Sequence, residues 1–239
     1  MKNNSMNIFE KKIIWITGGS KGIGFETAKL FSSMGAIVIT SSRTNSDKLL
    51  ELKDIRYIRC DISDSNSVKK SYNEIIKLYG KIDVLINNAS VIGIKSIVDL
   101  SEDEFDRINN INYKGTFLLC REVLPEMLKE NQGMIVNILS IVCFKSFKGS
   151  GVYSASKSAT ASMMKILREE VRESGIDVIN IYPGATETSM WDESKKDDRV
   201  GKMMEAEDVA FAIVNAVETS FNDRIVVEEI VLRPKLGDL

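Results

Sequence analysis

The feature that most constrains the fold is an alternation of short apolar runs with helical patterns. Seven runs have the length and composition of buried strands, at residues 12–17, 36–40, 55–60, 83–86, 133–139, 176–181 and 224–231. Helical patterns separate them, at residues 25–34, 65–79, 101–113, 115–130, 153–173 and 207–219. Parallel strands need crossover connections, and strands buried on both faces are apolar along their whole length. The pattern therefore predicts an α/β fold, a doubly wound parallel sheet of about seven strands with helices on both faces.

A single domain is expected for this pattern. The 239 residues are enough for one full hydrophobic core, and no linker, internal repeat or low-complexity segment interrupts residues 12–239. Residues 1–11 are expected to form a flexible extension, and they lack the apolar segment of a signal peptide. Cys60, Cys120 and Cys143 are odd in number and far apart, which favours reduced thiols in a cytoplasmic protein over a disulfide framework.

Composition excludes several classes of function. The net charge is −2 and no basic face or tail is evident, so no nucleic-acid partner is expected. No apolar run reaches the roughly 18–20 residues that cross a bilayer, so no membrane partner is expected either. The sequence contains no histidine, which removes Ser-His-Asp and Cys-His hydrolase mechanisms and almost every zinc site. Acid–base chemistry must then use Tyr, Lys, Asp or Glu, and no metal site is predicted.

A glycine-rich turn follows the first predicted strand. Gly18, Gly22 and Gly24 lie in the segment Thr-Gly-Gly-Ser-Lys-Gly-Ile-Gly, inside a strand–turn–helix–strand unit. Glycine lets the backbone approach a pyrophosphate, and a helix N-terminus offers free N–H groups and the positive end of its dipole. The spacing differs from the general G-x-G-x-x-G fingerprint. The context nevertheless favours dinucleotide binding over a purely structural turn.

Polar residues or glycines also follow the other predicted strands. In a doubly wound sheet, ligands bind in the crevice outside the carboxyl ends of the strands. The residues at these ends are Ser42-Arg43, Asp61-Ile62, Asn87 to Ser90, Ser140 and Pro183-Gly184. Core packing does not explain why so many strands deliver such residues to one edge. This edge is therefore predicted to hold the functional site.

Residues 149–157 contain a tyrosine and a lysine at helical spacing. Tyr153 and Lys157 are four residues apart, so on a helix they lie on one face. An ammonium nearby favours the phenolate, so Lys157 is expected to lower the tyrosine pKa from its usual value of about 10. The alternative is a core tyrosine beside a solvated lysine. Ser154 and Lys157 also form an S-x-x-K pattern, but the K-T-G triplet of serine acyl-enzymes is missing.

Together these motifs resemble the short-chain dehydrogenase/reductase family from residue 12 to the C-terminus. Thr17 to Gly24 matches the family's cofactor loop and Asn87 to Ala89 its fourth-strand motif. The residues that match its catalytic tetrad are Asn112, Ser140, Tyr153 and Lys157. The resemblance implies a Rossmann-type fold and cofactor contacts from Gly18, Ser20, Lys21, Gly22, Ile23, Gly24, Arg43, Asp61, Ile62, Asn88, Ala89, Tyr153, Lys157, Pro183, Gly184, Thr186 and Thr188.

The resemblance also implies the chemistry, hydride transfer between a nicotinamide and a carbonyl or alcohol carbon. Tyr153 would give a proton to the carbonyl oxygen, or take it back in oxidation. Lys157 would lower the tyrosine pKa and hold the nicotinamide ribose, Ser140 would orient the substrate oxygen, and Asn112 would hold a water linking Lys157 to solvent. A ketone or oxoacyl reductase is expected. The family further implies a homo-oligomer, a tetramer or dimer, built on helices 115–130 and 153–173.

The second predicted strand end favours NADP(H) over NAD(H). An NAD site places an acidic residue here against the adenosine ribose, but this chain carries Ser41, Ser42 and Arg43. Arg43 and Lys21 suit a 2′-phosphate, the alternative being two solvated surface charges. Asp61 follows the third strand, where the family places an acid against the adenine. An NAD-dependent alcohol dehydrogenase and a non-catalytic dinucleotide-sensing protein remain the alternatives.

Two positions depart from the family pattern, and the substrate stays open. Ser90 replaces a usual glycine, so the local backbone must differ or the side chain must point away from the cofactor. Cys143 likewise stands where glycine is common. The substrate pocket is expected to be shaped by residues 192–202 and by Ile94, Phe144, Phe147, Met190 and Trp191. These side chains suit an aliphatic or aromatic ketone without selecting one.

Overall fold

The computed structural model of the protein describes residues 7–52, 54–189, 201–222 and 224–237. Its seven strands form one sheet in the order β3-β2-β1-β4-β5-β6-β7, and all neighbouring pairs are parallel. The strands are β1 (Ile13–Thr17), β2 (Ile37–Ser42), β3 (Ile55–Arg59), β4 (Val84–Asn87), β5 (Gly133–Ile138), β6 (Ile176–Pro183) and β7 (Glu229–Leu232). The predicted doubly wound parallel sheet is confirmed, and its order reverses between β1 and β4.

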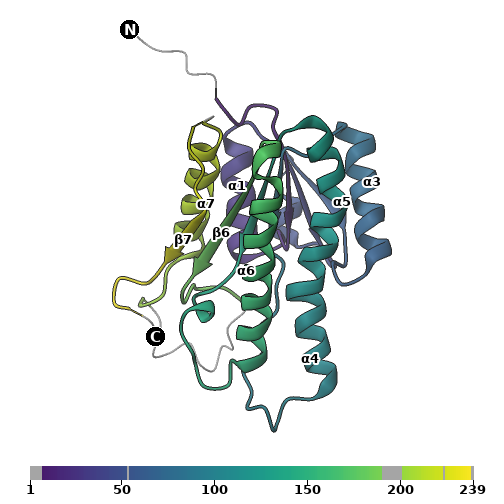
Figure 1. Cartoon of the computed structure of the whole chain (residues 1–239). Coiled ribbons are helices and arrows are strands. Elements are labelled where there is room, and N and C mark those ends of the chain that lie inside the picture. The colour runs from purple at the N-terminus through teal and green to yellow at the C-terminus, as the bar shows by residue number, and fades with distance from the viewer. Residues whose placement is uncertain (1–6, 53, 190–200, 223, 238–239) are drawn as a thin grey trace.

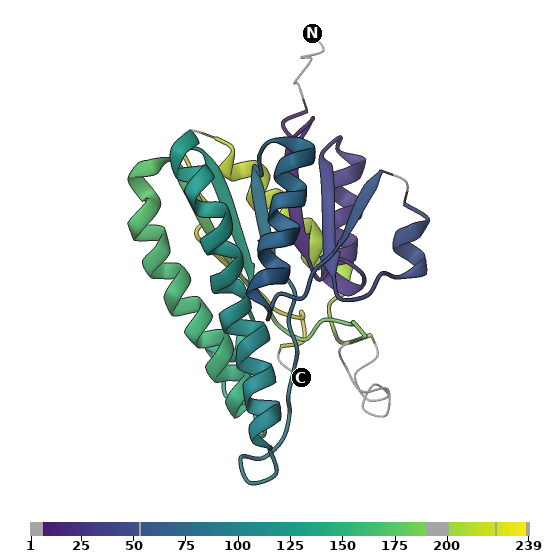
Figure 2. The ribbon, with the colours of Figure 1, turned by 90° about the vertical axis from the view of Figure 1, so that its right-hand side faces the viewer.

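Helices cover both faces of the sheet (Figures 1 and 2). They are α1 (Gly22–Ser33), α2 (Asp47–Leu50), α3 (Ser65–Tyr79), α4 (Glu102–Asn109), α5 (Gly115–Glu130), α6 (Gly151–Val171) and α7 (Ala206–Ser220). α1 and α7 share a core with one face, and α3, α5 and α6 with the other. A π-helical turn, Asn110–Lys114, joins α4 to α5. None of the helices in the described ranges is long and apolar enough to cross a lipid bilayer.

The two cores explain why the central strands are buried on both faces. Successive side chains of a strand point to opposite faces of the sheet. In β1, Ile14 and Ile16 belong to the core under α1 and α7, whereas Ile13 and Trp15 belong to the core under α3, α5 and α6. All five residues of β1 are buried. A strand in this position cannot carry the alternating polar residues of a half-exposed strand.

Several boundaries differ from the sequence-based prediction. α1 begins at Gly22 and not at residue 25, so the glycine turn itself forms the first helical turn. β7 spans Glu229–Leu232 and not residues 224–231, because only these residues pair with β6. α2 has four residues, too few to produce a periodic pattern, and was not predicted.

The flexible extension predicted for residues 1–11 agrees only in part with the structure. Residues 1–6 lie outside the described residues. Phe9, in contrast, is completely buried, and its ring lies 5.2 Å from that of Phe31 and 5.9 Å from that of Phe221. The packed part of the protein therefore begins before residue 12.

Candidate active site

A cavity of about 690 Å³ lies outside the carboxyl ends of the central strands. In Figure 1 this is the lower edge of the sheet, toward which β6 points and beyond which α4 extends. The cavity lies over the β1–β4 junction, where the strand order reverses. It is lined by every predicted cofactor residue except Gly24, and by Ser140, Tyr153 and Lys157 of the predicted tetrad. The structure thus brings the strand-end residues together at one edge.

The glycine turn is held tightly against the end of β4. Gly18 and Gly22 have φ values of 70° and 57°, which other residues adopt only with strain. The Asn88 Nδ2 donates hydrogen bonds to the carbonyls of Thr17 (2.9 Å) and Gly18 (3.1 Å). A Cβ at Gly24 would lie 2.3 Å from this same nitrogen, so Gly24 serves loop packing and does not line the cavity.

The N-terminus of α1 is open to a ligand. The N-cap residue, Lys21, makes no side-chain cap hydrogen bond, and the first turn contains no acidic residue. The first N–H groups of a helix lack intrahelical acceptors and lie at the positive end of the helix dipole. Because Gly22 and Ile23 also line the cavity, this helix end is suited to an anionic group.

Charge in the cavity is strongly one-sided. Its described lining contains one acidic residue, Asp61, against the basic residues Lys21, Arg43, Arg107, Lys148 and Lys157. The Asp61 carboxylate accepts hydrogen bonds from the backbone N–H (3.0 Å) and the hydroxyl (2.6 Å) of Ser63. A cavity of this charge attracts anions although the whole chain carries a net charge of −2.

Tyr153 and Lys157 lie in the first two turns of α6, and both are buried. The exposed fractions of the two residues are 7% and 4%. Burial raises the pKa of Tyr153 to about 12, although a side-chain hydrogen bond with Ser140 lowers it. Burial lowers the pKa of Lys157 to about 8. Both shifts favour the neutral form, as expected for groups removed from water.

The expectation that Lys157 lowers the tyrosine pKa is therefore wrong for this structure. The Lys157 Nζ donates a hydrogen bond to the carbonyl of Ile138 at 2.8 Å. Ser140, and not Lys157, is the group that offsets part of the effect of burial on Tyr153. Desolvation of the phenolate is the larger effect, because the phenol is enclosed between α6 and the end of β5.

Asn112 lies behind the cavity wall, in the π-helical turn, and is 2% exposed. Its Oδ1 accepts hydrogen bonds from the Ser90 hydroxyl (3.0 Å) and the Val91 N–H (2.8 Å). Its Nδ2 donates to the Val91 carbonyl (2.9 Å) and the Ser156 hydroxyl (3.1 Å). Asn112 thus connects the segment after β4 to α6, and its predicted water-holding role stays a prediction.

The Ser90 side chain points toward Asn112, which answers the question raised by the missing glycine. The sequence showed that Ser90 was unusual but not the direction of its hydroxyl. Ser156 was missed altogether, because a serine inside a helical pattern carries no signal of its own. The only indication in the sequence is that Ser156 directly precedes Lys157.

The substrate side of the cavity agrees only in part with the prediction. Ile94 and Phe147 line it, together with Ile92 and Val142. Phe144 does not, because its ring packs 4.7 Å from the ring of Tyr182 and the residue is 54% exposed. The predicted contributions of Met190, Trp191 and residues 192–200 lie outside the described residues. Cys143 also stands apart from the lining, and burial raises the pKa of its thiol.

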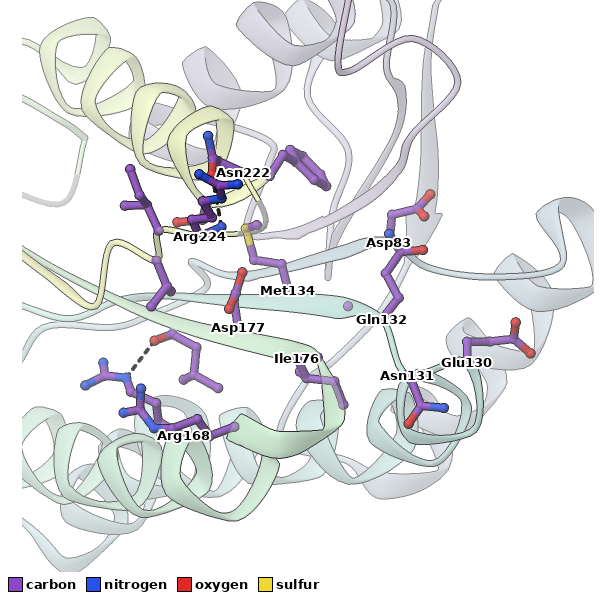
Figure 3. A pocket seen from close by; sticks show the side chains of 18 residues that line it. Asp83, Glu130, Asn131, Gln132, Met134, Arg168, Ile176, Asp177, Asn222 and Arg224 are labelled. Carbon is purple, nitrogen blue, oxygen red and sulfur yellow. Dashed lines mark hydrogen bonds between the residues drawn. The ribbon is translucent and has the colours of Figure 1, made fainter.

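A second cavity, of about 620 Å³, lies at the opposite edge, around the amino ends of β5 and β6 (Figure 3). Two of its arginines are held by carboxylates. Arg168 lies 3.3 Å from Glu228, and Arg172 lies 2.7 Å from Glu169 and 2.9 Å from Glu228. None of the predicted site residues lines this cavity, so the carboxyl-edge cavity is the candidate active site.

Comparison with known proteins agrees with this placement. A model of the short chain dehydrogenase family matches residues 12–199. The sepiapterin reductase of Chlorobaculum tepidum is 35% identical over 244 residues, covering 96% of this chain and 98% of the relative. An uncharacterised oxidoreductase of Thermotoga maritima is 33% identical over 191 residues, covering 77% of this chain and 75% of the relative.

A solved structure supports the same assignment. A metagenomic short-chain oxidoreductase in complex with NADP is similar with a TM-score of 0.82 at 25% identity, covering 96% of this chain and 99% of the other. The family match spans most of the chain, and the two relatives are named as a reductase and an oxidoreductase. The chain therefore belongs to the short-chain dehydrogenase family of oxidoreductases.

Proposed function

We propose that the protein reduces a ketone or oxoacyl carbonyl with NADPH, using Tyr153 as the proton donor. The observation that carries this proposal is the buried phenol of Tyr153. A phenol keeps its proton at neutral pH even at its ordinary pKa of about 10, and burial raises the pKa of Tyr153 to about 12. Carbonyl reduction needs such a donor, since the substrate oxygen gains a proton as its carbon gains a hydride.

The residues of the carboxyl-edge cavity fit a dinucleotide phosphate. A Cβ at Gly18 would lie 2.8 Å from the Ala89 Cα, so only glycine keeps the turn this close to β4. The uncapped start of α1 suits the pyrophosphate, and the basic Lys21 and Arg43 suit a 2′-phosphate. Within the described part of the chain, no carboxylate lies within 4 Å of the Arg43 guanidinium. When bound, the reduced nicotinamide supplies the hydride.

The remaining tetrad residues support proton transfer. Ser140 hydrogen-bonds the Tyr153 side chain, so a carbonyl oxygen placed at Tyr153 lies within reach of both hydroxyls. Lys157 lies one helical turn away and lines the same cavity. Its ammonium would hold the nicotinamide ribose when the cofactor is bound. Asn112 acts from behind the wall by fixing α6 against the segment after β4.

The proposal is tested by mixing the protein with NADPH and a panel of ketones, aldehydes and oxoacyl thioesters. Because a 35% identical relative is named a sepiapterin reductase, sepiapterin belongs in the panel. We expect loss of NADPH absorbance with at least one carbonyl compound. Faster turnover with NADH would favour the NAD-dependent alcohol dehydrogenase instead. Tight dinucleotide binding with no turnover of any compound would favour a cofactor-sensing protein.

We also propose that the protein is a cytoplasmic homo-oligomer, a dimer or tetramer built on α5 and α6. These helices lie side by side on one face of the molecule (Figure 2). They leave Phe117 and Ile166 44% and 60% exposed. Burial of such side chains between two copies would be favourable. Light scattering on the purified protein tests the proposal, and a monomer at micromolar concentration would contradict it.

A further inference from the structure

We infer that Ser90 is a positioning residue that fixes Asn112 and, through it, the first turns of α6 on which Tyr153 lies. The inference rests on the proposed role of Tyr153 as proton donor. Ser90 follows β4 and lines the carboxyl-edge cavity. Its hydroxyl donates a hydrogen bond to the Asn112 Oδ1 at 3.0 Å.

The orientation of the Asn112 amide is determined by its neighbours. The Val91 N–H donates to the Oδ1 at 2.8 Å, and the Val91 carbonyl accepts from the Nδ2 at 2.9 Å. Exchanging the amide oxygen and nitrogen would place a donor against the Val91 N–H and an acceptor against the Val91 carbonyl. The two backbone bonds to Val91 therefore fix the amide so that its oxygen, and not its nitrogen, faces the Ser90 hydroxyl.

The hydrogen-bond chain continues from Asn112 into α6. The Asn112 Nδ2 donates to the Ser156 hydroxyl at 3.1 Å, and this hydroxyl donates to the Tyr153 carbonyl at 2.8 Å. Ser156 is completely buried, so water does not compete for these bonds. Three side chains, Ser90, Asn112 and Ser156, thus connect the end of β4 to the backbone of the proposed proton donor.

A second contact holds α6 on the other side of Lys157. The Thr160 hydroxyl donates to the Asn112 carbonyl at 3.0 Å. Asn112 consequently binds α6 at Ser156 and at Thr160, one residue before and three residues after Lys157. A shift of Asn112 would move both contacts and displace Tyr153 and Lys157 together. Small displacements of reacting groups have large effects on rate.

Ser90 is the member of this chain that can be removed without unfolding the site. The Asn112 Oδ1 keeps its bond from the Val91 N–H when the hydroxyl is lost. Ser90 is half-buried beside the cavity, so water can solvate the freed position. We therefore expect a change in catalysis with little change in stability, whereas a purely structural serine would show the reverse.

The experiment compares the Ser90→Ala, Ser90→Gly and Ser90→Thr variants with the wild type in NADPH-dependent carbonyl reduction. Loss of one hydrogen bond to the amide predicts a fall of about three- to ten-fold in kcat for the alanine and glycine variants. The KM for NADPH should not change, and threonine should restore kcat because it keeps the hydroxyl. The matched control is Ser96→Ala, since Ser96 lies in the same segment, is exposed and bonds Asp99.

A second readout uses the free protein. Hydrogen–deuterium exchange in residues 153–160 and at the Val91 N–H should be faster in Ser90→Ala than in the wild type. Wild-type kcat and exchange in Ser90→Ala would overturn the inference, as would a threonine variant as slow as alanine. The proposed function fails separately, if Tyr153→Phe keeps wild-type kcat. An inactive Tyr153→Phe beside a fully active Ser90→Ala refutes only the role of Ser90.

Discussion

The two cavities lie at opposite ends of the same parallel strands and have similar volumes, about 690 and 620 Å³. In the carboxyl-edge cavity, burial has displaced the pKa values of Tyr153 and Lys157, and basic residues outnumber Asp61. In the amino-edge cavity, Arg168 and Arg172 are neutralised by Glu228 and Glu169. The two cavities therefore differ in whether their charged groups are already paired with groups of opposite charge, and not in size: Arg168 and Arg172 are ion-paired, whereas Tyr153 and Lys157 are desolvated at the cavity wall.

The direction of the strands explains the difference. In a parallel sheet with crossover helices, helices begin near the carboxyl ends of the strands and end near the amino ends. The carboxyl-edge cavity accordingly contains the start of α1, at Gly22, and the first turns of α6. The amino-edge cavity contains residues at the ends of α5 and α7, such as Asn131 and Phe221. The positive ends of the dipoles lie near the first cavity and the negative ends near the second.

The largest expected effect tests the proton donor. Tyr153→Phe removes the phenol oxygen and should lower kcat by about 10²- to 10⁴-fold, the usual range for loss of a general acid. The KM for NADPH should change little, because the ring is kept. Steady-state kinetics with an active carbonyl substrate measures both constants. A kcat within three-fold of the wild type would remove Tyr153 from the mechanism.

The next effect concerns stability and pH. Burial lowers the pKa of Lys157 from 10.5 to about 8. Below pH 8 both the folded and unfolded states carry the proton, and the folded state pays a desolvation cost of about 3 kcal/mol. Between pH 8 and about 10.5 the folded state has lost the proton while the unfolded state keeps it, so stability rises with pH.

Lys157→Met removes this titration. Urea unfolding should show that the wild type gains stability relative to the variant by about 1.4 kcal/mol per pH unit above pH 8. The variant should be inactive at every pH, which separates the stability cost of Lys157 from its function. Parallel stability curves between pH 7 and 10 would mean that Lys157 is not desolvated as the structure indicates.

A smaller effect is expected at the adenosine end. Arg43→Ala should raise the KM for NADPH about ten-fold, because a charge-assisted bond to the 2′-phosphate is lost. The KM for NADH should not change. Arg56→Ala is the matched control, since Arg56 lies on the neighbouring strand β3 and is paired with Glu74 at 3.8 Å. Equal changes in the two KM values for Arg43→Ala would contradict the preference for NADP(H).

The smallest effect is expected in the amino-edge cavity. Burial raises the pKa of Asp177, and the charge of Arg172 offsets part of this rise. Asp177→Asn should leave kcat and both KM values within two-fold of the wild type. A ten-fold loss of kcat, with stability unchanged, would show that this cavity contributes to function and would weaken the contrast between the two edges.

The sequence predicts the sheet well, because the same physical pattern repeats in each strand. Strands buried on both faces lack exposed charged side chains, and that requirement is met in β1, β2, β4, β5 and β6. The edge strands β3 and β7 instead carry exposed Arg56 and Glu229. The start of β7 was predicted at residue 224, five residues before the observed start at Glu229. The apolar residues 225–227 have the composition of a strand, but their backbone does not pair with β6. Burial of a strand is visible in its amino-acid composition, whereas backbone pairing with a neighbouring strand is not.

The site is predictable to the extent that backbone geometry demands particular residues. Gly18 and Gly24 were predicted from the glycine-rich turn, and the structure shows why a side chain is excluded there: Gly18 has a φ of 70°, and a Cβ at Gly24 would lie 2.3 Å from the Asn88 Nδ2. The direction of the Ser90 hydroxyl was not predictable, because it depends on the π-helical turn that presents Asn112. Phe144 and Phe147 look equivalent in sequence, yet only Phe147 lines the cavity. The pKa of Tyr153 likewise follows from packing and not from its spacing to Lys157.

The central claim is that reduction takes place at the carboxyl edge, beside Tyr153. A crystal structure of the protein with NADP+ tests it most directly. The account predicts the pyrophosphate at the start of α1, the 2′-phosphate at Arg43 and Lys21, and the nicotinamide beside Tyr153 and Lys157, with the amino-edge cavity free of cofactor. A dinucleotide bound at the amino edge, or bound with its nicotinamide far from Tyr153, would contradict the account.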